Sequence, residues 1–89
     1  MQGRATKQFW SCFHALPLEI QQQAQKIYDI WKTNPHHPAL RFKRIRSDQP
    51  IYSVRIGRGW RALAVLEAET ATWFWIGSHS DYDHLISRL

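Results

Sequence analysis

The apolar positions in the first third of the chain recur with the period of a helix. In residues 7–16 they fall at i, i+4 and i+7, and the next segment continues at helical spacing to Trp31. The members of these two stripes are Phe9, Phe13 and Leu16, then Ile20, Ala24, Ile27 and Trp31. Pro17 suits the first turn of the second helix, where an N–H is not needed. Asn34 ends that helix because it precedes Pro35 and therefore avoids the α region. The sequence thus predicts a helical hairpin.

From residue 40 onward the apolar positions alternate, which is the period of a strand. Four such segments are bounded by turn-forming residues. They are "LRFKRI" at 40–45, "IYSVRI" at 51–56, "WRALAVLE" at 60–67 and "ATWFWIG" at 71–77. In the second segment Ser53 and Arg55 share one face, opposite to Tyr52, Val54 and Ile56. The glycines in "GRG" at 57–59 suit a tight hairpin turn between the second and third segments.

The last predicted strand carries aromatic residues on both faces. Strict alternation places Trp73 and Trp75 on one face, with Phe74 and Ile76 on the other. Both faces are therefore expected to be covered. Residues 80–89 then form a short helix, with Ser80 as its N-cap and acidic residues in its first turn.

These elements predict an α+β fold with two layers. We expect the N-terminal helical hairpin to pack on a three- to four-stranded antiparallel sheet, followed by the short C-terminal helix. Residues 2–6 are a further candidate for a short strand at the sheet edge. With 89 residues, the chain is expected to form a single domain over 1–89.

Positive charge is concentrated in the middle of the chain. The formal net charge is +5, from 12 Lys and Arg against 7 Asp and Glu. Between residues 41 and 61 only Asp48 opposes seven cations, which are Arg41, Lys43, Arg44, Arg46, Arg55, Arg58 and Arg61. Such a block indicates an anionic partner, either a nucleic acid or an acidic protein segment. A solvated sheet surface with solubilising charges is the alternative reading.

Other features narrow the class of protein. No apolar run reaches the roughly 18 residues of a membrane span, and the first residues lack the apolar stretch of a secretory signal. The lone Cys12 cannot form an internal disulfide and is expected to be a small buried apolar residue. His36 and His37 are read as turn residues, because no second ligand cluster has metal-binding spacing. We therefore expect a cytoplasmic protein that needs no metal and no membrane.

Three stretches together resemble the RelE/ParE superfamily of small bacterial toxins from type II toxin–antitoxin modules. They are "NPHHPALRFKRI", "YSVRIGRGWRAL" and "WFWIGSHSDYDHLI", and they look like the helix end, the central hairpin and the C-terminal strand of that family. The resemblance extends over nearly the whole chain. It rests on the helical hairpin, the Gly-aromatic-Arg sequence after a glycine-rich turn, and the Gly-x-His near the end.

The resemblance implies a function and partners. RelE-like toxins are mRNA endonucleases, many of them acting in the ribosomal A site, and they use no metal or other cofactor. An antitoxin encoded beside the toxin wraps and inhibits it, and DNA is reached only indirectly through that antitoxin. ParE-like members share the fold but poison DNA gyrase. The expected function is therefore a translation-inhibiting mRNA endonuclease neutralised by a cognate antitoxin.

The resemblance also implies roles for particular residues. Arg61 matches the family's arginine on the scissile phosphate, and Arg55 matches a basic residue of the preceding strand. His79 falls where the family carries an arginine or histidine after the last strand, and Tyr82 falls near the tyrosine that contacts substrate. RelE has two lysines spaced i, i+2 on the strand before the turn, where this chain has Ser53 and Arg55.

The chemistry of these side chains agrees with the implied roles. A guanidinium matches two phosphate oxygens, and histidine is suited to acid–base work near neutrality. The candidate catalytic residues are Arg61, His79, Arg55 and Tyr82, and the candidate RNA-binding residues are Arg41, Lys43, Arg44 and Arg58. Each also has a purely structural reading. Arg61 could pair with Glu67 or Asp81, His79 could cap an element, and Tyr82 could pack in the core.

Three function classes therefore stay open. The first is a ribonuclease toxin, which the His79, Arg55 and Arg61 constellation favours. The second is a gyrase inhibitor of ParE type, and the third is a non-catalytic module that binds an antitoxin. The absence of lysine at Ser53 favours the latter two. On the aromatic face that the core does not use, a groove for an antitoxin helix is preferred to a platform for nucleobases.

Overall fold

The computed structural model describes residues 1–88 and confirms the α+β fold class. The helices are α1 (Lys7–His14), α2 (Leu18–Thr33) and α3 (His79–Ile86), with a 3-10 turn η1 (Pro38–Leu40). The strands are β1 (Gln2–Ala5), β2 (Lys43–Arg44), β3 (Ile51–Ile56), β4 (Trp60–Glu67) and β5 (Thr70–Ser78). They form one five-stranded sheet in the order β1-β5-β4-β3-β2. Within residues 1–88 no helix has both the length and the apolar character needed to cross a membrane.

The candidate strand near the N-terminus is present as β1 at one edge of the sheet. It runs parallel to β5, whereas every other neighbouring pair is antiparallel. Backbone hydrogen bonds hold both of its ends, from Gln2 N–H to Glu69 O and from Thr6 N–H to Trp73 O, each at 3.0 Å. The sheet therefore has one more strand than the local patterns alone had established.

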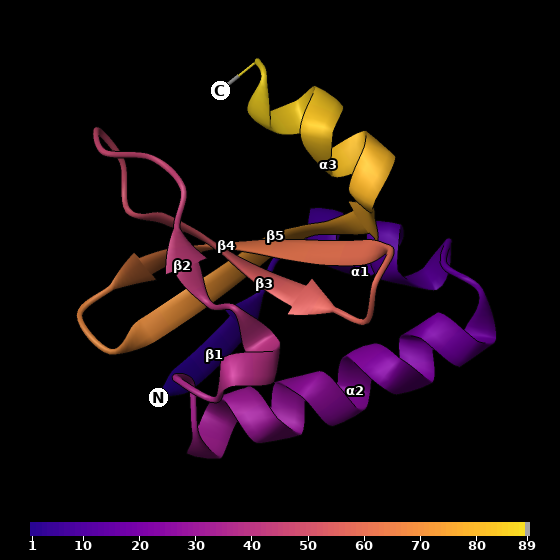
Figure 1. Ribbon diagram of the computed structural model, residues 1–89, viewed down its shortest axis with the longest axis horizontal. Helices are drawn as coiled ribbons and strands as arrows, with labels where there is room; N and C mark the ends of the chain where they lie inside the picture. Colours follow the sequence, from indigo (N-terminus) through magenta and orange to yellow (C-terminus); the bar gives the residue numbers. More distant parts are fainter. Residues whose placement is uncertain (89) are drawn as a thin grey trace.

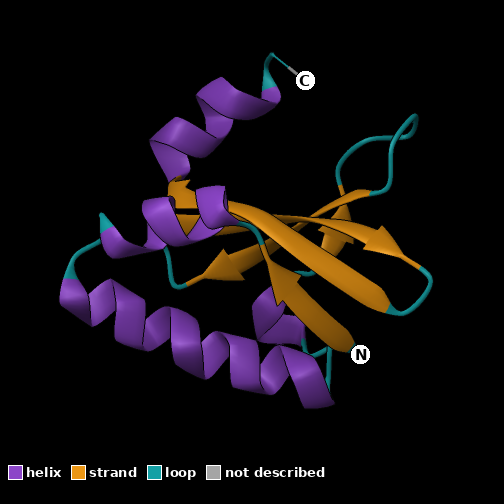
Figure 2. Ribbon diagram, turned by 180° about the vertical axis from the view of Figure 1, so that it is seen from behind, coloured by secondary structure: helices purple, strands orange, loops and turns teal. Residues whose placement is uncertain are grey.

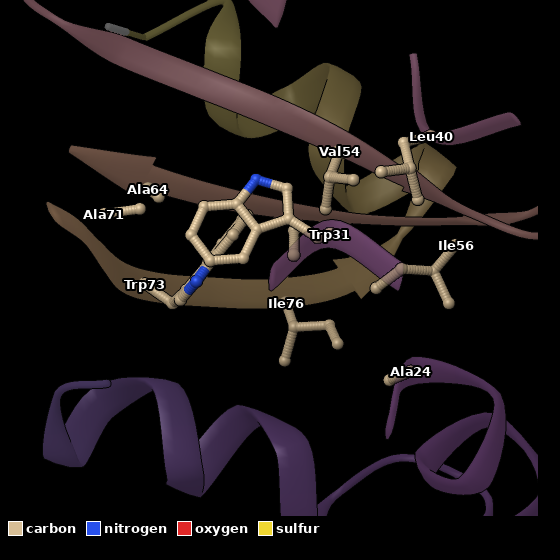
Figure 3. Close-up of a cluster of buried hydrophobic side chains, with 10 residues drawn as sticks. Ala24, Trp31, Leu40, Val54, Ile56, Ala64, Ala71, Trp73 and Ile76 are labelled. Atoms are coloured by element: carbon tan, nitrogen blue, oxygen red, sulfur yellow. The ribbon is translucent and has the colours of Figure 1, made fainter. Parts of the chain in front are cut away.

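The helices lie on opposite faces of the sheet. Figure 1 shows α2 along one side of the strands and α3 on the other, and Figure 2 shows α1 and β1 from behind. The main core lies between the sheet and the helices α1 and α2. At its centre are the rings of Trp31 and Trp73, 5.2 Å apart and surrounded by aliphatic side chains (Figure 3). A second, smaller core of Ile51, Leu63 and Tyr82 lies under α3.

The two predicted N-terminal helices begin and end for identifiable reasons. Thr6 caps α1, since its Oγ1 accepts a hydrogen bond from Phe9 N–H at 3.1 Å. Pro17 stands at the N-cap of α2, one position before the predicted first turn. The predicted end of α2 is confirmed, because Thr33 is its last residue and Asn34 caps it. Ala24 and Trp31 of the predicted stripe are buried against the sheet.

The prediction of an extended segment over 40–45 is wrong at Leu40 and Arg41. Residues 38–40 form η1, in which Pro38 occupies the first turn and the His37 side chain accepts from Ala39 N–H. Arg41 then has a left-handed backbone with φ of 46°. Lys43–Arg44 form β2 against β3, and Ile45 N–H adds a hydrogen bond to Ile51 O at 2.9 Å. The proline and its histidine cap override the short alternating pattern.

The assignment of faces along β5 is also wrong. The pairing of β4 with β5 shifts between Leu63 and Ala64, which pair with Trp75 and Trp73, so Phe74 is an extra residue in a β-bulge. Trp73 and Ile76 consequently face the main core, whereas Phe74 and Trp75 face the second core under α3. The bulge reverses the alternation and allows the strand to bury aromatic rings on both faces.

The C-terminal helix begins two residues earlier than predicted. Its N-cap is Ser78 and not Ser80, and the Ser78 hydroxyl accepts from Asp81 N–H at 3.1 Å. The helix ends at Ile86, and Leu89 of the predicted segment lies outside the described residues. The earlier start makes His79 the first residue of α3, directly beside the end of the sheet.

Candidate functional site

Two arginines face each other across the β3–β4 hairpin. Arg55 and Arg61 are direct register partners on neighbouring strands, and such pairs hold their side chains next to one another on the same face. The turn between them uses Gly57 in a left-handed conformation, with φ of 61°. The hairpin thus places two cations side by side at one end of the sheet.

Main-chain carbonyls orient both guanidinium groups. Arg55 Nε donates to Gly57 O at 2.9 Å, and Arg61 Nη1 donates to Trp60 O at 2.8 Å. Within residues 1–88 no carboxylate forms a salt bridge with either arginine, so Arg61 does not pair with Glu67 or Asp81. Partial burial, followed by the charge of Arg55, lowers the pKa of Arg61 from its ordinary value. Arg61 nevertheless stays protonated, because no protein environment deprotonates a guanidinium near neutrality.

The start of α3 brings an imidazole and a phenol to the same end of the sheet. The His79 backbone N–H donates to Gly59 O at 2.7 Å, which ties the helix to the β3–β4 turn. The His79 ring lies 6.0 Å from the Tyr82 ring, and its Nδ1 is 3.6 Å from Asp83 Oδ1. Tyr82 is buried and its ring lies 6.5 Å from that of Trp75. Tyr82 therefore belongs to the second core while also reaching the site.

These groups line one pocket of about 240 Å³, which we call the basic pocket. Its residues are Arg41, Lys43, Ser53, Arg55, Arg61, His79 and Tyr82. The structure thus brings together all four candidate catalytic residues and two of the four candidate RNA-binding residues. They come from the η1–β2 connection, three strands and α3, so segments far apart in sequence converge on one end of the sheet.

The other two candidate RNA-binding residues lie outside the basic pocket. Arg44 turns toward the β2–β3 loop, where its Nε donates to Arg46 O and its Nη2 to Ser47 O. Arg58 is exposed in the β3–β4 turn. The loop also contains the only arginine–carboxylate salt bridge of residues 1–88, between Arg46 and Asp48 at 2.9 Å. Hydrogen bonding to Arg46 lowers the pKa of Asp48.

Ser53 is a pocket residue that was not among the candidate site residues. It is only 3% exposed, and it lies on the same face of β3 as Arg55. Its backbone pairs with Lys43 on one side and with Leu63 on the other. The i, i+2 spacing from Arg55 was the available signal, because strand alternation places the two side chains on the same face.

The basic pocket has the composition of a phosphate-binding site. It contains four permanent cations, one histidine and two hydroxyls, and no carboxylate. Guanidinium groups that are already fixed by backbone carbonyls can bind phosphate oxygens with little reorganisation. Within residues 1–88, no three or more His, Cys, Asp or Glu side chains gather as a metal site would require. The arrangement can bind a phosphodiester and move a proton beside it.

Comparisons with known proteins agree with this architecture. The model of the ParE-like toxin domain matches residues 18–84. RelE in the RelB–RelE antitoxin–toxin complex of Methanococcus jannaschii superposes with a TM-score of 0.73 at 18% identity, covering 91% of this chain and 96% of that one. YafQ of E. coli has a TM-score of 0.73 at 9% identity with the same coverage. The isolated E. coli RelE toxin has a TM-score of 0.67 at 14% identity, covering 98% and 96% of the two chains.

No curated protein matches the chain in sequence. The family is therefore established by the domain match, which spans more than half of the chain, and the structural likenesses show the fold. The chain belongs to the ParE-like toxin domain family.

Proposed function

We propose that the protein is a metal-independent mRNA endonuclease that inhibits translation. The observation that carries this proposal is the convergence of Arg55, Arg61, His79 and Tyr82 in one pocket without a carboxylate. Gyrase binding does not require a histidine beside paired arginines, whereas phosphodiester cleavage does require both charge stabilisation and proton transfer. Solved relatives named as RelE and YafQ toxins share the fold.

Four of the pocket residues have defined tasks in that reaction. The ribose 2′-oxygen loses its proton and attacks phosphorus, and the bond to the 5′-oxygen breaks as that oxygen gains a proton. Arg55 and Arg61 stabilise the charge that develops on the non-bridging oxygens. His79 is the group suited to proton transfer near neutral pH. Tyr82 is held by the second core, so its hydroxyl is a fixed contact for the substrate.

A purified-protein assay tests the cleavage proposal. Arg61→Ala and His79→Ala should each lower the rate of RNA cleavage by about 10²–10⁴, the range found for charge-stabilising and acid–base groups. Lys26→Ala and His14→Ala are matched controls, because both side chains are exposed on the helices of the opposite face. Wild-type protein that leaves RNA intact would contradict the proposal.

The antitoxin is the proposed protein partner. Between α1, α2 and the sheet lies an apolar cavity of about 210 Å³, lined mostly by aromatic and aliphatic side chains. Trp10 at its margin is 46% exposed and so extends the apolar lining of the cavity to the surface. An amphipathic antitoxin helix places its apolar side chains in this cavity, and a separate acidic segment of the antitoxin covers the basic pocket on the opposite face of the sheet. The archaeal RelE relative was solved bound to its RelB antitoxin.

A gyrase inhibitor is the second candidate function. Ser53 leaves the floor of the basic pocket uncharged, and the matching domain is ParE-like. A supercoiling assay separates the two functions, because a gyrase poison would inhibit purified gyrase while RNA stayed intact. A third candidate, a non-catalytic antitoxin-binding module, would leave both gyrase and RNA unaffected.

A further inference from the structure

The backbone of residues 57–60, at the tip of the β3–β4 hairpin, holds three groups of the basic pocket. Three of its carbonyls accept hydrogen bonds from pocket residues. The bonds run from Arg55 Nε to Gly57 O at 2.9 Å, from Arg61 Nη1 to Trp60 O at 2.8 Å, and from the His79 backbone N–H to Gly59 O at 2.7 Å. The position of this backbone therefore determines where both guanidinium groups and the start of α3 lie.

Gly57 is a residue of this backbone with little intrinsic restraint. Its φ is 61°, in the left-handed region that glycine enters at low cost. Because glycine has no Cβ to limit the neighbouring peptide groups, its carbonyl keeps one direction only when surrounding atoms hold it. Arg55 depends on that direction, since its Nε donates to Gly57 O. A side chain that packs on Gly57 thus contributes to the orientation of Arg55.

The amide end of Gln23 lies directly on Gly57. A Cβ added at Gly57 would be 2.7 Å from Gln23 Nε2 and 3.2 Å from its Cδ and Oε1. Gln23 belongs to α2, on the face of the sheet opposite to the basic pocket (Figure 1). Its chain neighbour Ala24 and the residue before Gly57, Ile56, are both buried in the main core, which fixes the backbone on each side of the contact. By contrast, a Cβ at Gly59 would meet no atom within 4 Å.

We propose that Gln23 is a positioning residue for the basic pocket. Its side chain packs on Gly57 and keeps that peptide group in the direction that orients Arg55, although Gln23 itself touches no substrate. This inference rests on the proposed function, in which Arg55 binds a phosphate. Without the Gln23 side chain the turn gains freedom, so Arg55 has to be ordered when the anion binds. That ordering weakens the binding of phosphate.

NMR of the ligand-free protein gives the first test. In Gln23→Ala the Arg55 Nε–H should exchange with water about 3- to 10-fold faster than in the wild type, the effect of weakening one hydrogen bond. Gln22→Ala is the matched control, because it makes the same change at an exposed position one residue earlier on α2. Gln23→Met should behave like the wild type, since it keeps a side chain of similar length over Gly57.

Binding of a single-stranded DNA oligonucleotide gives the second test. The oligonucleotide presents the phosphates of the proposed substrate, but it lacks the 2′-hydroxyl that attacks phosphorus and is therefore not cleaved. Its dissociation constant should rise by about 3- to 10-fold in Gln23→Ala, again the effect of one hydrogen bond. The constant should stay unchanged in Gln22→Ala and in Gln23→Met.

Neither measurement detects cleavage, so this inference and the proposed nuclease function can fail separately. Either measurement left unchanged in Gln23→Ala would overturn the inference even if RNA is cleaved. The same conclusion would follow if Gln22→Ala or Gln23→Met changed as much as Gln23→Ala. Faster exchange at Arg55 and weaker DNA binding in Gln23→Ala alone would support the positioning role even in a protein that left RNA intact.

Discussion

Arg55 and Arg61 are the residues at which stability and function conflict most directly. Like charges placed opposite each other on adjacent strands destabilise a sheet, and no carboxylate within residues 1–88 neutralises this pair. Their guanidinium groups are fixed by Gly57 O and Trp60 O before any ligand arrives. An anion between them would remove the repulsion, so the pair has the character of a preorganised binding site.

Arg41 combines a strained backbone with a side chain in the basic pocket. Its φ of 46° is left-handed, which costs a residue with a Cβ about 1–2 kcal/mol. Arg41→Gly removes this strain but adds freedom to the unfolded chain. We therefore expect a free energy of unfolding that is unchanged or raised by about 1 kcal/mol, together with weaker RNA binding.

Arg41→Ala is the matched control for that prediction, because it removes the same charge and keeps the strain. Urea denaturation should rank the glycine variant above the alanine variant, and both should lose RNA affinity equally. A glycine variant less stable than the alanine variant would show that the left-handed backbone is not strained.

At the scale of single residues, the sequence predicted which side chains lie together. It did not predict the backbone conformations and the burial that hold them there. The alternation of β3 and the short turn placed Arg55 and Arg61 on one face, and the structure has them there. The strain at Arg41 was not predictable, because it depends on the turn made by η1. The burial of Ser53 depends on its neighbouring strands, β2 and β4, whose pairing is not evident from local patterns.

Among the elements, β5 supports the basic pocket through its residues Trp75 and Gly77. A Cβ added at Gly77 would lie 2.6 Å from Trp75 Cζ2, because the indole ring covers this glycine. Trp75 in turn packs near Tyr82. Gly77→Ala should therefore lower the free energy of unfolding by about 1–3 kcal/mol, the usual cost of overpacking, and should reduce RNA cleavage by displacing Tyr82.

Gly59→Ala is the control for that substitution, because a Cβ at Gly59 would meet no atom within 4 Å. Thermal unfolding followed by circular dichroism should show a clearly lower melting temperature for the Gly77 variant and little change in melting temperature for the Gly59 variant. Equal stability of the two variants would contradict the proposed support of Tyr82 by Trp75.

The elements that the sequence predicted correctly are those whose signals are local. Helical spacing and the Asn34–Pro35 pair identified α2 and its end. The bulge at Phe74 has no comparable signal, since aromatic residues occur on both sides of it and only the pairing with β4 reveals the shift. The cap at Ser78 was missed because Ser80 is an equally good capping residue. The parallel pairing of β1 with β5 joins opposite ends of the chain, which local patterns do not show.

For the whole molecule, the two faces of the sheet have different proposed tasks. The apolar cavity lies on the face of α1 and α2, and the basic pocket lies on the face of α3. Two partners of different chemistry are thus assigned to separate surfaces of a small protein. An antitoxin long enough to reach both would block RNA directly.

The charge on the basic pocket predicts a strong dependence of RNA binding on salt. Each phosphate that the protein neutralises contributes about −0.7 to the slope of log affinity against log salt for a single strand. Arg61→Ala should therefore make this slope shallower by about 0.7, whereas Lys26→Ala on the opposite face should leave it unchanged. Fluorescence anisotropy with a labelled RNA oligonucleotide measures the slope. Affinity that is independent of salt would rule out phosphate contacts.

Expression in bacteria tests whether Arg61 and His79 are needed for the proposed cleavage of mRNA. Growth and the 5′ ends of cellular mRNA should be measured for the wild type, Arg61→Ala, His79→Ala and the Lys26→Ala control, with circular dichroism of each purified protein. We expect growth arrest and new mRNA ends for the wild type and the control, and neither effect for the two folded pocket variants. Folded Arg61→Ala and His79→Ala proteins that still arrest growth and generate the same mRNA ends would contradict the proposal.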